Sequence, residues 1–147
     1  MSNVTRIEVM DGDYVVNVEF MRQKMQYVTE SGETEYSRDI QGNLRFTTFA
    51  AVLIEDIRTG SSKDKVNSLF RELLENKDVY VGVATQHYKD KYNKRVGEKL
   101  ALTRALKQSC DNMMKLNPSI SLQDFKQQIS PEVWSTLIST RWHNLKK

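Results

Sequence analysis

The sequence has few of the residues that break or crosslink a chain. It contains two prolines, six glycines and one cysteine among 147 residues. The single thiol, Cys110, has no second cysteine to pair with, which is typical of a reducing compartment, so we expect a cytoplasmic protein. No apolar run reaches the roughly 20 residues that span a bilayer, and the first residues have no apolar stretch of the signal-peptide type. The sequence therefore predicts a soluble chain with no membrane segment.

The motifs of catalysis and of cofactor binding are also missing. The chain has no Gly-x-Ser-x-Gly elbow, no Gly-x-x-x-x-Gly-Lys loop and no Gly-x-Gly-x-x-Gly turn. Its two histidines, His87 and His143, and its one cysteine are too few and too far apart for a four-ligand zinc site. A lone pair such as His87 and Asp90 has almost no diagnostic value. We therefore expect a protein that is not an enzyme and holds no metal or cofactor.

Charge of each sign is concentrated in one half of the chain. Residues 1–76 carry 9 Lys and Arg against 13 Asp and Glu, a net of −4, whereas residues 77–147 carry 13 against 6, a net of +7. An excess of positive charge favours an acidic partner, of which nucleic acid is the usual one. The alternative is a solvated basic surface that keeps the protein soluble.

Strand patterns dominate the first part of the chain. Val16, Val18 and Phe20 alternate with their neighbours, and turn residues at 11–13 and 30–33 separate this stretch from strands on either side. The pattern predicts an antiparallel meander that ends with a short segment at 35–40. Residues 44–57 fit a helical face and also a strand buried on both faces, and we favour the strand. Residues 79–83 predict a further strand.

Helical spacing is clearest after residue 93. Leu102, Leu106 and Met113 predict one helix over 94–116, which Asn117-Pro118 ends. We assign four further apolar residues of this segment to the same broad face: Val96, Leu100, Cys110 and Met114.

Two shorter helical patterns complete the fold. A helix over 62–75 is predicted to begin at Ser61 or Ser62, and a C-terminal helical pair to include a second helix that opens at Ser130-Pro131. We therefore expect an α+β fold in which an antiparallel β-sheet packs against the long helix. The α+β domain spans 1–116 with the helix 62–75 inserted, and 117–147 form a helical extension packed on the same domain.

A basic, aromatic stretch before and within the start of the long helix is the first candidate site. Lysines neutralise phosphates, tyrosines stack on unpaired bases, and a helix N-terminus attracts anions. The alternative is that the tyrosines anchor the loop on the core while the lysines keep it soluble. The candidate nucleic-acid-binding residues are Tyr88, Lys89, Lys91, Tyr92, Lys94, Arg95 and Lys99.

The C-terminal helices carry two further candidates. A short helix, a tight turn and a longer helix make the outline of a helix-turn-helix, with Ser135, Thr136, Ser139 and Thr140 on the exposed face. An apolar stripe at the end of the chain holds both tryptophans, and Trp and Arg often dominate interfaces. Core packing is the default interpretation of such a stripe. The candidate interface residues, for a host protein or a homodimer, are Trp134, Ile138, Arg141 and Trp142.

One segment, residues 81–106, also carries a recognisable arrangement. A strand with a Gly-x-Ala core leads into a loop with an Asp and an aromatic residue, and then into a helix with the pattern Gly-x-x-x-Ala-x-x-Arg-Ala. The matching residues are Gly82, Ala84, Asp90, Tyr92, Gly97, Ala101, Arg104 and Ala105. The segment resembles an element of small bacteriophage accessory proteins of unassigned function, although His87 and Tyr88 replace the Cys-x-Pro often found in the loop. The resemblance implies a sheet-plus-helix unit, a further strand upstream and a bacteriophage source.

Two functions are consistent with these patterns. We predict a phage-type accessory protein that binds nucleic acid through the basic loop and helix start, in the cytoplasm of the host cell. The alternative is a protein–protein interaction module, such as an inhibitor of a host enzyme or a dimerising protein, that docks through the C-terminal helices.

Overall fold

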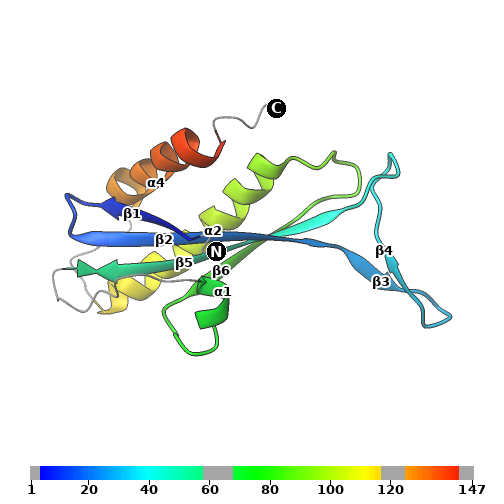
Figure 1. The fold of residues 1–147 in the computed structure, drawn as a ribbon, viewed down its shortest axis with the longest axis horizontal. Helices are drawn as coiled ribbons and strands as arrows, with labels where there is room; N and C mark the ends of the chain where they lie inside the picture. Colours follow the sequence, from blue (N-terminus) through cyan, green and yellow to red (C-terminus); the bar gives the residue numbers. More distant parts are fainter. Residues whose placement is uncertain (1–3, 58–67, 117–124, 143–147) are drawn as a thin grey trace.

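The fold is a four-stranded antiparallel sheet with helices on both faces (Figure 1). The computed structural model describes residues 4–57, 68–116 and 125–142. The sheet has the order β1-β2-β5-β6, and β3 pairs with β4 in a separate hairpin. The strands are β1 (Thr5–Val9), β2 (Tyr14–Lys24), β3 (Gln26–Val28), β4 (Thr34–Tyr36), β5 (Phe46–Asp56) and β6 (Tyr80–Thr85). The helical elements are α1 (Leu69–Glu72), α2 (Lys94–Leu116), η2 (Phe125–Ile129), α4 (Ser130–Leu137) and η3 (Ile138–Trp142).

The α+β class and the long helix are confirmed. The ambiguous stretch 44–57 forms β5, a central strand that pairs with β2 on one side and β6 on the other. Ala50, Ala51 and Val52 are all fully buried, which explains why the alternation of a half-exposed strand is absent there. Among the described residues, no helix is long and apolar enough to span a membrane.

One face of the sheet packs on α2 and α4 to form the main core. Alternate residues of β2 face this core, as the sequence pattern predicts. Gly82 of β6 lies so close to α2 that an added Cβ would meet the Ala101 carbonyl oxygen at 1.9 Å and the Ala105 nitrogen at 2.6 Å. Arg104 of the same helix donates a hydrogen bond to the Val83 carbonyl. Much of the Gly-x-Ala and Ala-x-x-Arg-Ala pattern therefore serves the contact between strand and helix.

The predicted apolar face of α2 is partly wrong. Leu102, Leu106 and Met113 are buried, but Val96 is 59% and Leu100 is 42% exposed. A helix turns by about 100° per residue, so Val96 and Leu100 lie about 120° and 160° around the axis from Leu102. They therefore belong to the outer side of the helix, and the apolar face that we expected was too broad.

The opposite face of the sheet carries α1, and here the predicted boundaries are corrected. Ser68 has an extended backbone with φ −155° and ψ 125° and caps the helix, which begins at Leu69. The predicted caps Ser61 and Ser62 lie outside the described residues. Glu19 of β2 accepts hydrogen bonds from the Leu69 and Phe70 amides at 2.8 and 3.2 Å. This buried carboxylate satisfies the free N–H groups at the helix start, and no sequence pattern indicates it.

Over the described residues 125–142 the C-terminal pair is one continuous helical stretch, so no turn separates two helices at Ser130 and the helix-turn-helix outline is wrong there. Ile129 has helical backbone angles, φ −78° and ψ −53°, and η2 passes directly into α4 and then η3. Pro131 follows the π-helical η2, whose N–H groups bond five residues back, and it stands in the first turn of α4, where a missing N–H is tolerated. α4 begins at Ser130 with Pro131 in its first turn, as predicted, but the residues before it are helical too, so the turn that we expected there is absent.

Candidate nucleic-acid interface

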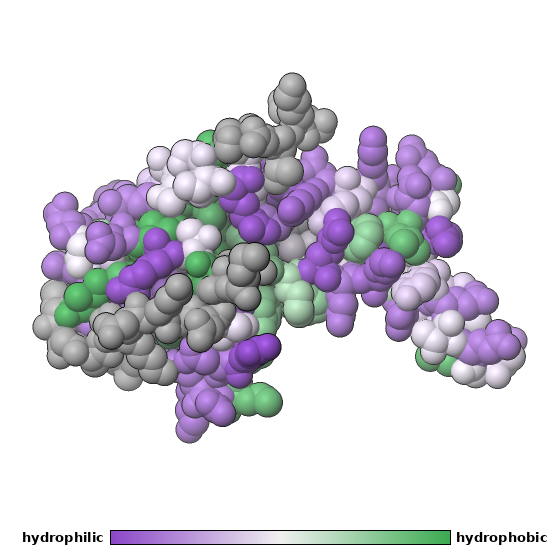
Figure 2. Space-filling model, in the orientation of Figure 1, coloured by the Kyte–Doolittle hydropathy of each residue, from purple (hydrophilic) through white to green (hydrophobic). Residues whose placement is uncertain are grey.

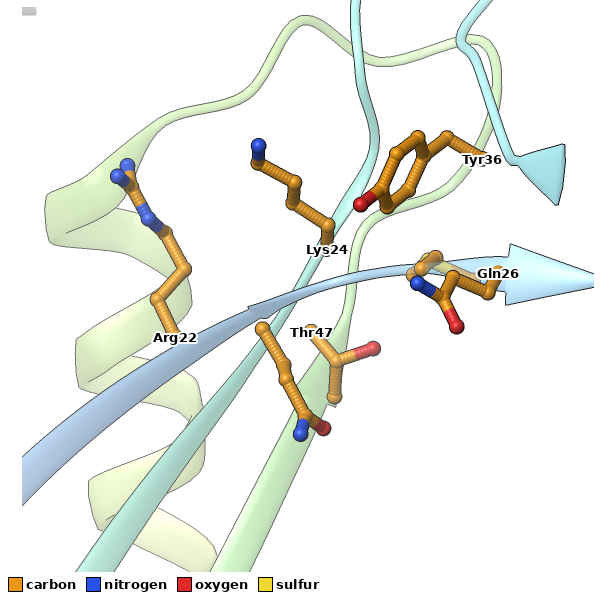
Figure 3. A pocket seen from close by; sticks show the side chains of 7 residues that line it. Arg22, Lys24, Gln26, Tyr36 and Thr47 are labelled. Carbon is orange, nitrogen blue, oxygen red and sulfur yellow. The ribbon is translucent and has the colours of Figure 1, made fainter.

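The α2-side face of the sheet continues past the helix, and its exposed end is basic. Arg22 and Lys24 occupy the positions in β2 that follow the buried Val16 and Val18 in the same alternation, and both are exposed. Their side chains rise from the strand toward the basic loop and Tyr36 (Figure 3). They border a hollow of about 570 Å³, which is lined by Arg22, Gln23, Lys24, Met25, Gln26, Tyr36 and Thr47.

Arg22 joins this strand end to the candidate loop. Its guanidinium carbon lies 4.4 Å from the centroid of the Phe46 ring and 5.5 Å from that of Tyr92. The two rings pack on each other with centroids 4.8 Å apart. Such cation–π contacts hold the guanidinium beside the rings while its N–H groups still reach solvent. Tyr92 is therefore part of the support beneath the surface, as the anchoring alternative predicts for this residue.

The loop between β6 and α2 is held mainly by backbone and amide contacts. Gln86 accepts from the Phe46 amide at 3.1 Å and donates to the Asp90 carbonyl at 2.7 Å. Arg45 donates to the Gln86 carbonyl at 2.8 Å, and the Ile40 amide donates to the Tyr88 carbonyl at 2.7 Å. These contacts shape the loop while the side chains of Tyr88, Lys89 and Lys91 stay exposed.

The start of α2 concentrates positive charge. Asn93 accepts from the Val96 amide at 3.1 Å, so its side chain caps the helix and occupies one of the N–H groups that we expected to bind phosphate. The first turn contains no acidic residue and begins with Lys94 and Arg95. Cations at the positive end of a helix dipole are unfavourable unless an anion compensates them.

The seven predicted nucleic-acid-binding residues do not share one environment. Tyr88, Lys89, Lys91 and Lys94 are exposed, whereas Tyr92, Arg95 and Lys99 are half-buried. Lys99 places its ammonium 5.7 Å from the Trp142 ring, on the flank of α2 that faces η3. The residues that sequence reasoning missed are Arg22, Lys24 and Tyr36. Arg22 and Lys24 could have been found from the sequence, because alternate residues of the same strand change there from apolar to basic.

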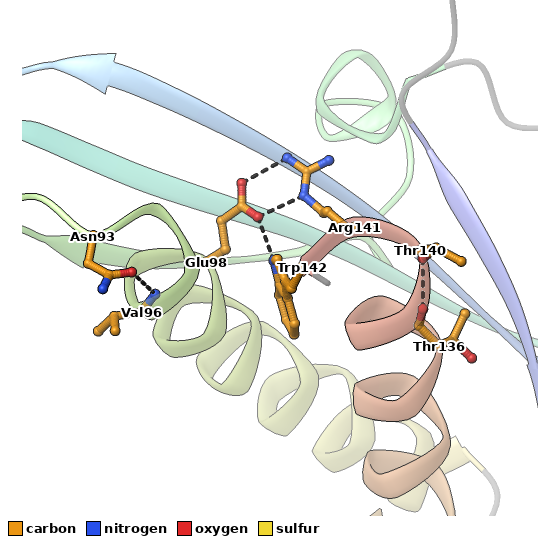
Figure 4. A network of polar contacts seen from close by, with 7 residues as sticks. All are labelled: Asn93, Val96, Glu98, Thr136, Thr140, Arg141 and Trp142. Atoms are coloured by element: carbon orange, nitrogen blue, oxygen red, sulfur yellow. Dashed lines mark hydrogen bonds and ion pairs between the residues drawn. The ribbon is translucent and has the colours of Figure 1, made fainter. Parts of the chain in front are cut away.

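The structure places the predicted interface residues of the C-terminal helix in unequal positions, and Figure 4 shows two of them, Arg141 and Trp142, beside Glu98. Trp142 is 1% exposed, stacks on Trp134 with ring centroids 5.6 Å apart and donates to Glu98 at 2.9 Å. Core packing, the default interpretation, therefore describes Trp142. Ile138 remains 41% exposed.

Arg141 completes this contact between η3 and the first turns of α2. It donates twice to Glu98, at 2.7 and 2.8 Å, and these hydrogen bonds raise the pKa of its guanidinium. Two of the hydroxyls on the exposed face of the expected second helix bond within their own helix, with Thr136 donating to the Glu132 carbonyl and Thr140 to the Thr136 carbonyl.

Potential metal ligands do not gather in the described ranges. No cluster of three His, Cys, Asp or Glu side chains there is arranged to hold a metal ion. Burial raises the pKa of the Cys110 thiol to about 12, so the thiol stays protonated and unreactive at neutral pH.

Comparisons with known proteins add no relative. No family model matches the chain, no curated protein matches its sequence, and no solved structure matches its fold.

Proposed function

We propose that this protein binds single-stranded nucleic acid along the exposed end of its sheet. The basic surface consists of five exposed cationic side chains and two exposed tyrosines: Arg22, Lys24, Lys89, Lys91, Lys94, Tyr36 and Tyr88. The observation that supports the proposal most directly is the contact of Arg22 with Phe46 and Tyr92. This contact brings Arg22, from the N-terminal half of the chain, beside the loop and helix start that carry the lysines of the C-terminal half.

The electrostatics favour a polyanion over a small acidic ligand. The cations are distributed over β2, the loop before α2 and the helix start, so a single phosphate would contact only a few of them. A polyanion that crosses this end would neutralise several and release counterions from each phosphate. It would also compensate Lys94 at the positive end of the helix dipole.

Exposed rings favour unpaired bases over a duplex. Tyr36 and Tyr88 are 47% and 46% exposed, and each already has a cation beside it: Lys24 at 5.4 Å from Tyr36 and Lys89 at 5.8 Å from Tyr88. A cation beside an exposed ring suits a phosphate next to a stacked base, which is how sequence-tolerant single-strand binding proteins work. An accessory role in phage infection, without catalysis, is part of the proposal and is supported by the resemblance of residues 81–106.

The test is fluorescence anisotropy with a labelled single strand, a matching duplex and a series of salt concentrations. We expect the single strand to bind more tightly and its affinity to fall as salt rises, with a slope of about −0.7 per neutralised phosphate. Arg22→Ala with Lys24→Ala should make the slope less steep, by the contribution of about one to two phosphates. The matched control removes two exposed cations near the other end of α2, Lys107→Ala with Lys115→Ala, and should leave the slope unchanged.

Three results would contradict the proposal. Absence of binding to any nucleic acid at low salt removes it altogether. An equal effect of the Arg22/Lys24 and Lys107/Lys115 pairs would mean that net charge, and not this surface, attracts the ligand. Tighter binding of the duplex, with no effect of Tyr88→Ala on the single strand, would remove the stacking part.

A further inference from the structure

The β3–β4 hairpin projects from the body of the protein as an arm (Figure 1). We define the arm as residues 26–36. At its base, the Met25 amide donates to the Arg45 carbonyl, next to β5, and the Ser37 amide donates to the Met25 carbonyl. Each of its strands has three residues. A two-stranded hairpin without further cover is marginally stable in water.

The arm exposes side chains that usually lie in contacts. Tyr27 is 50%, Val28 is 69% and Tyr36 is 47% exposed, and all three belong to the same pair of short strands. Scattered apolar residues on a surface need no explanation, but several on one small projection indicate an interaction site. Aromatic residues are also the type most enriched in protein interfaces.

The charge of the arm identifies the partner surface. The arm contains Glu30, Glu33 and Glu35 and no cation, a net charge of −3, whereas residues 86–95 carry three Lys and one Arg against one Asp, a net of +3. No ion pair within the described part of the chain joins the three glutamates to a cation. Glu35 accepts from the Tyr27 hydroxyl at 2.9 Å, and this hydrogen bond raises the pKa of that tyrosine.

The two charged elements lie at the same end of the molecule. The loop that follows β4 contacts the basic loop through the Ile40 amide and the Tyr88 carbonyl, and hydrophilic side chains cover much of this end (Figure 2). Because both elements lie at one end, a two-fold axis there can bring each copy's arm to the other copy's basic segment. Most soluble homo-oligomers have such closed symmetry, in which each contact is made twice.

We propose that two copies of this chain associate by laying each arm, 26–36, on the basic segment 86–95 of the other copy. The carboxylates of Glu30, Glu33 and Glu35 then face the lysines. Tyr27, which is paired with Glu35 and lies on the same face of the arm, is placed beside Tyr88. The proposal does not rest on nucleic-acid binding, although both use the same basic segment. If both hold, nucleic acid and the second copy compete for it.

Sedimentation velocity without nucleic acid tests the association. At about 50 mM salt, where exposed charges within about 14 Å still interact, we expect a dimer that dissociates as the protein is diluted or the salt is raised. Reversal of the arm charge, Glu30→Lys with Glu33→Lys and Glu35→Lys, should give a monomer. The matched control reverses three exposed acids elsewhere, Glu8→Lys with Glu75→Lys and Asp111→Lys, and should remain dimeric. Circular dichroism checks that each variant is folded.

A charge swap makes the test specific for this contact. The basic-segment variant, Lys89→Glu with Lys91→Glu and Lys94→Glu, should also be monomeric, because its own arm now meets like charge. A mixture of the arm variant and the basic-segment variant should form a heterodimer, because both contacts are again between opposite charges.

Three outcomes overturn the proposal. The first is a wild-type protein that stays monomeric at low salt and high concentration. The second is a dimer that survives reversal of the arm charge. The third is a mixture of the two monomeric variants that fails to associate. Loss of nucleic-acid binding alone affects none of these results, so the failure of one proposal is distinguishable from the failure of the other.

Discussion

The two ends of β2 differ in what covers them, although they share one strand and one alternation. Between Tyr14 and Phe20 the residues that face α2 and α4 are apolar, and Val16 and Val18 are almost fully buried. Two and four positions beyond Phe20, the same face shows Arg22 and Lys24, both exposed. Because unpaired charges are not buried without a large penalty, the change of residue type marks where the cover of the helices ends.

The same contrast separates buried, partnered charges from the exposed cations of the proposed binding surface. Where α2 and η3 pack together, Glu98 of α2 is 3% exposed, and its oxygens accept hydrogen bonds from Arg141 and Trp142. Beyond the helices, Arg22 lies over two rings and has no carboxylate partner among the described residues. Partnered charges hold the protein together, and the cations without such a partner are the ones we propose to bind phosphate.

The largest difference in stability between a covered and an uncovered position is expected within α2 itself. Leu106→Ala should lower the free energy of unfolding by about 2–5 kcal/mol, because it leaves a cavity in the main core. Val96→Ala, a change of the same kind on the exposed side, should alter it by less than about 0.5 kcal/mol. Urea denaturation of both variants measures the two values. Similar losses would mean that the covered and uncovered sides of α2 are assigned wrongly.

The contact between β6 and α2 should be almost as sensitive. Gly82→Ala should destabilise the protein by about 1–3 kcal/mol or more, since the added methyl group meets backbone atoms of Ala101 and Ala105 that cannot turn aside. Val83→Ala, at the next position on the other face, should cost less than about 1 kcal/mol. Thermal melts compare the pair, and an unchanged melting temperature for Gly82→Ala would contradict the close packing.

A smaller loss is expected at the buried carboxylate. Glu98→Gln keeps the shape of the side chain but weakens the bonds to Arg141 and Trp142, so we expect a loss of about 1–3 kcal/mol. Glu75→Gln, at an exposed position, is the control and should have no measurable effect. Tryptophan emission gives a second readout, because the indole N–H of Trp142 donates to Glu98. A stable variant with unchanged emission would show that this contact is dispensable.

The smallest effect is expected at Tyr92. Its hydroxyl is buried and makes no hydrogen bond to any described residue, so Tyr92→Phe should leave stability unchanged or raise it by up to about 1 kcal/mol. Affinity for single strands should also stay the same, because the ring that supports Arg22 is retained. Tyr92→Ala should weaken both properties by removing the pair with Phe46. A clear loss of stability in the Phe variant would reveal a partner for the hydroxyl.

Sequence patterns determined the elements that depend on local spacing. The alternation around Val16 and Val18 gave β2, and the apolar spacing of Leu102, Leu106 and Met113 gave α2 with its observed bounds, Lys94–Leu116. Burial on one side of an element repeats with the period of that element, so it is recorded in consecutive residues. The basic composition of the loop before α2 can also be read directly from consecutive residues.

The tertiary structure alone decided which distant residues meet. Arg22 reaches Tyr92 across 70 positions, Glu19 caps a helix 50 positions away and Glu98 bonds to Arg141. No local period records such contacts, because they depend on how strands and helices pack in space. The exposure of Val96 and the burial of Trp142 were decided in the same way: neighbouring elements, and not the apolar character of a side chain, determine whether it is covered.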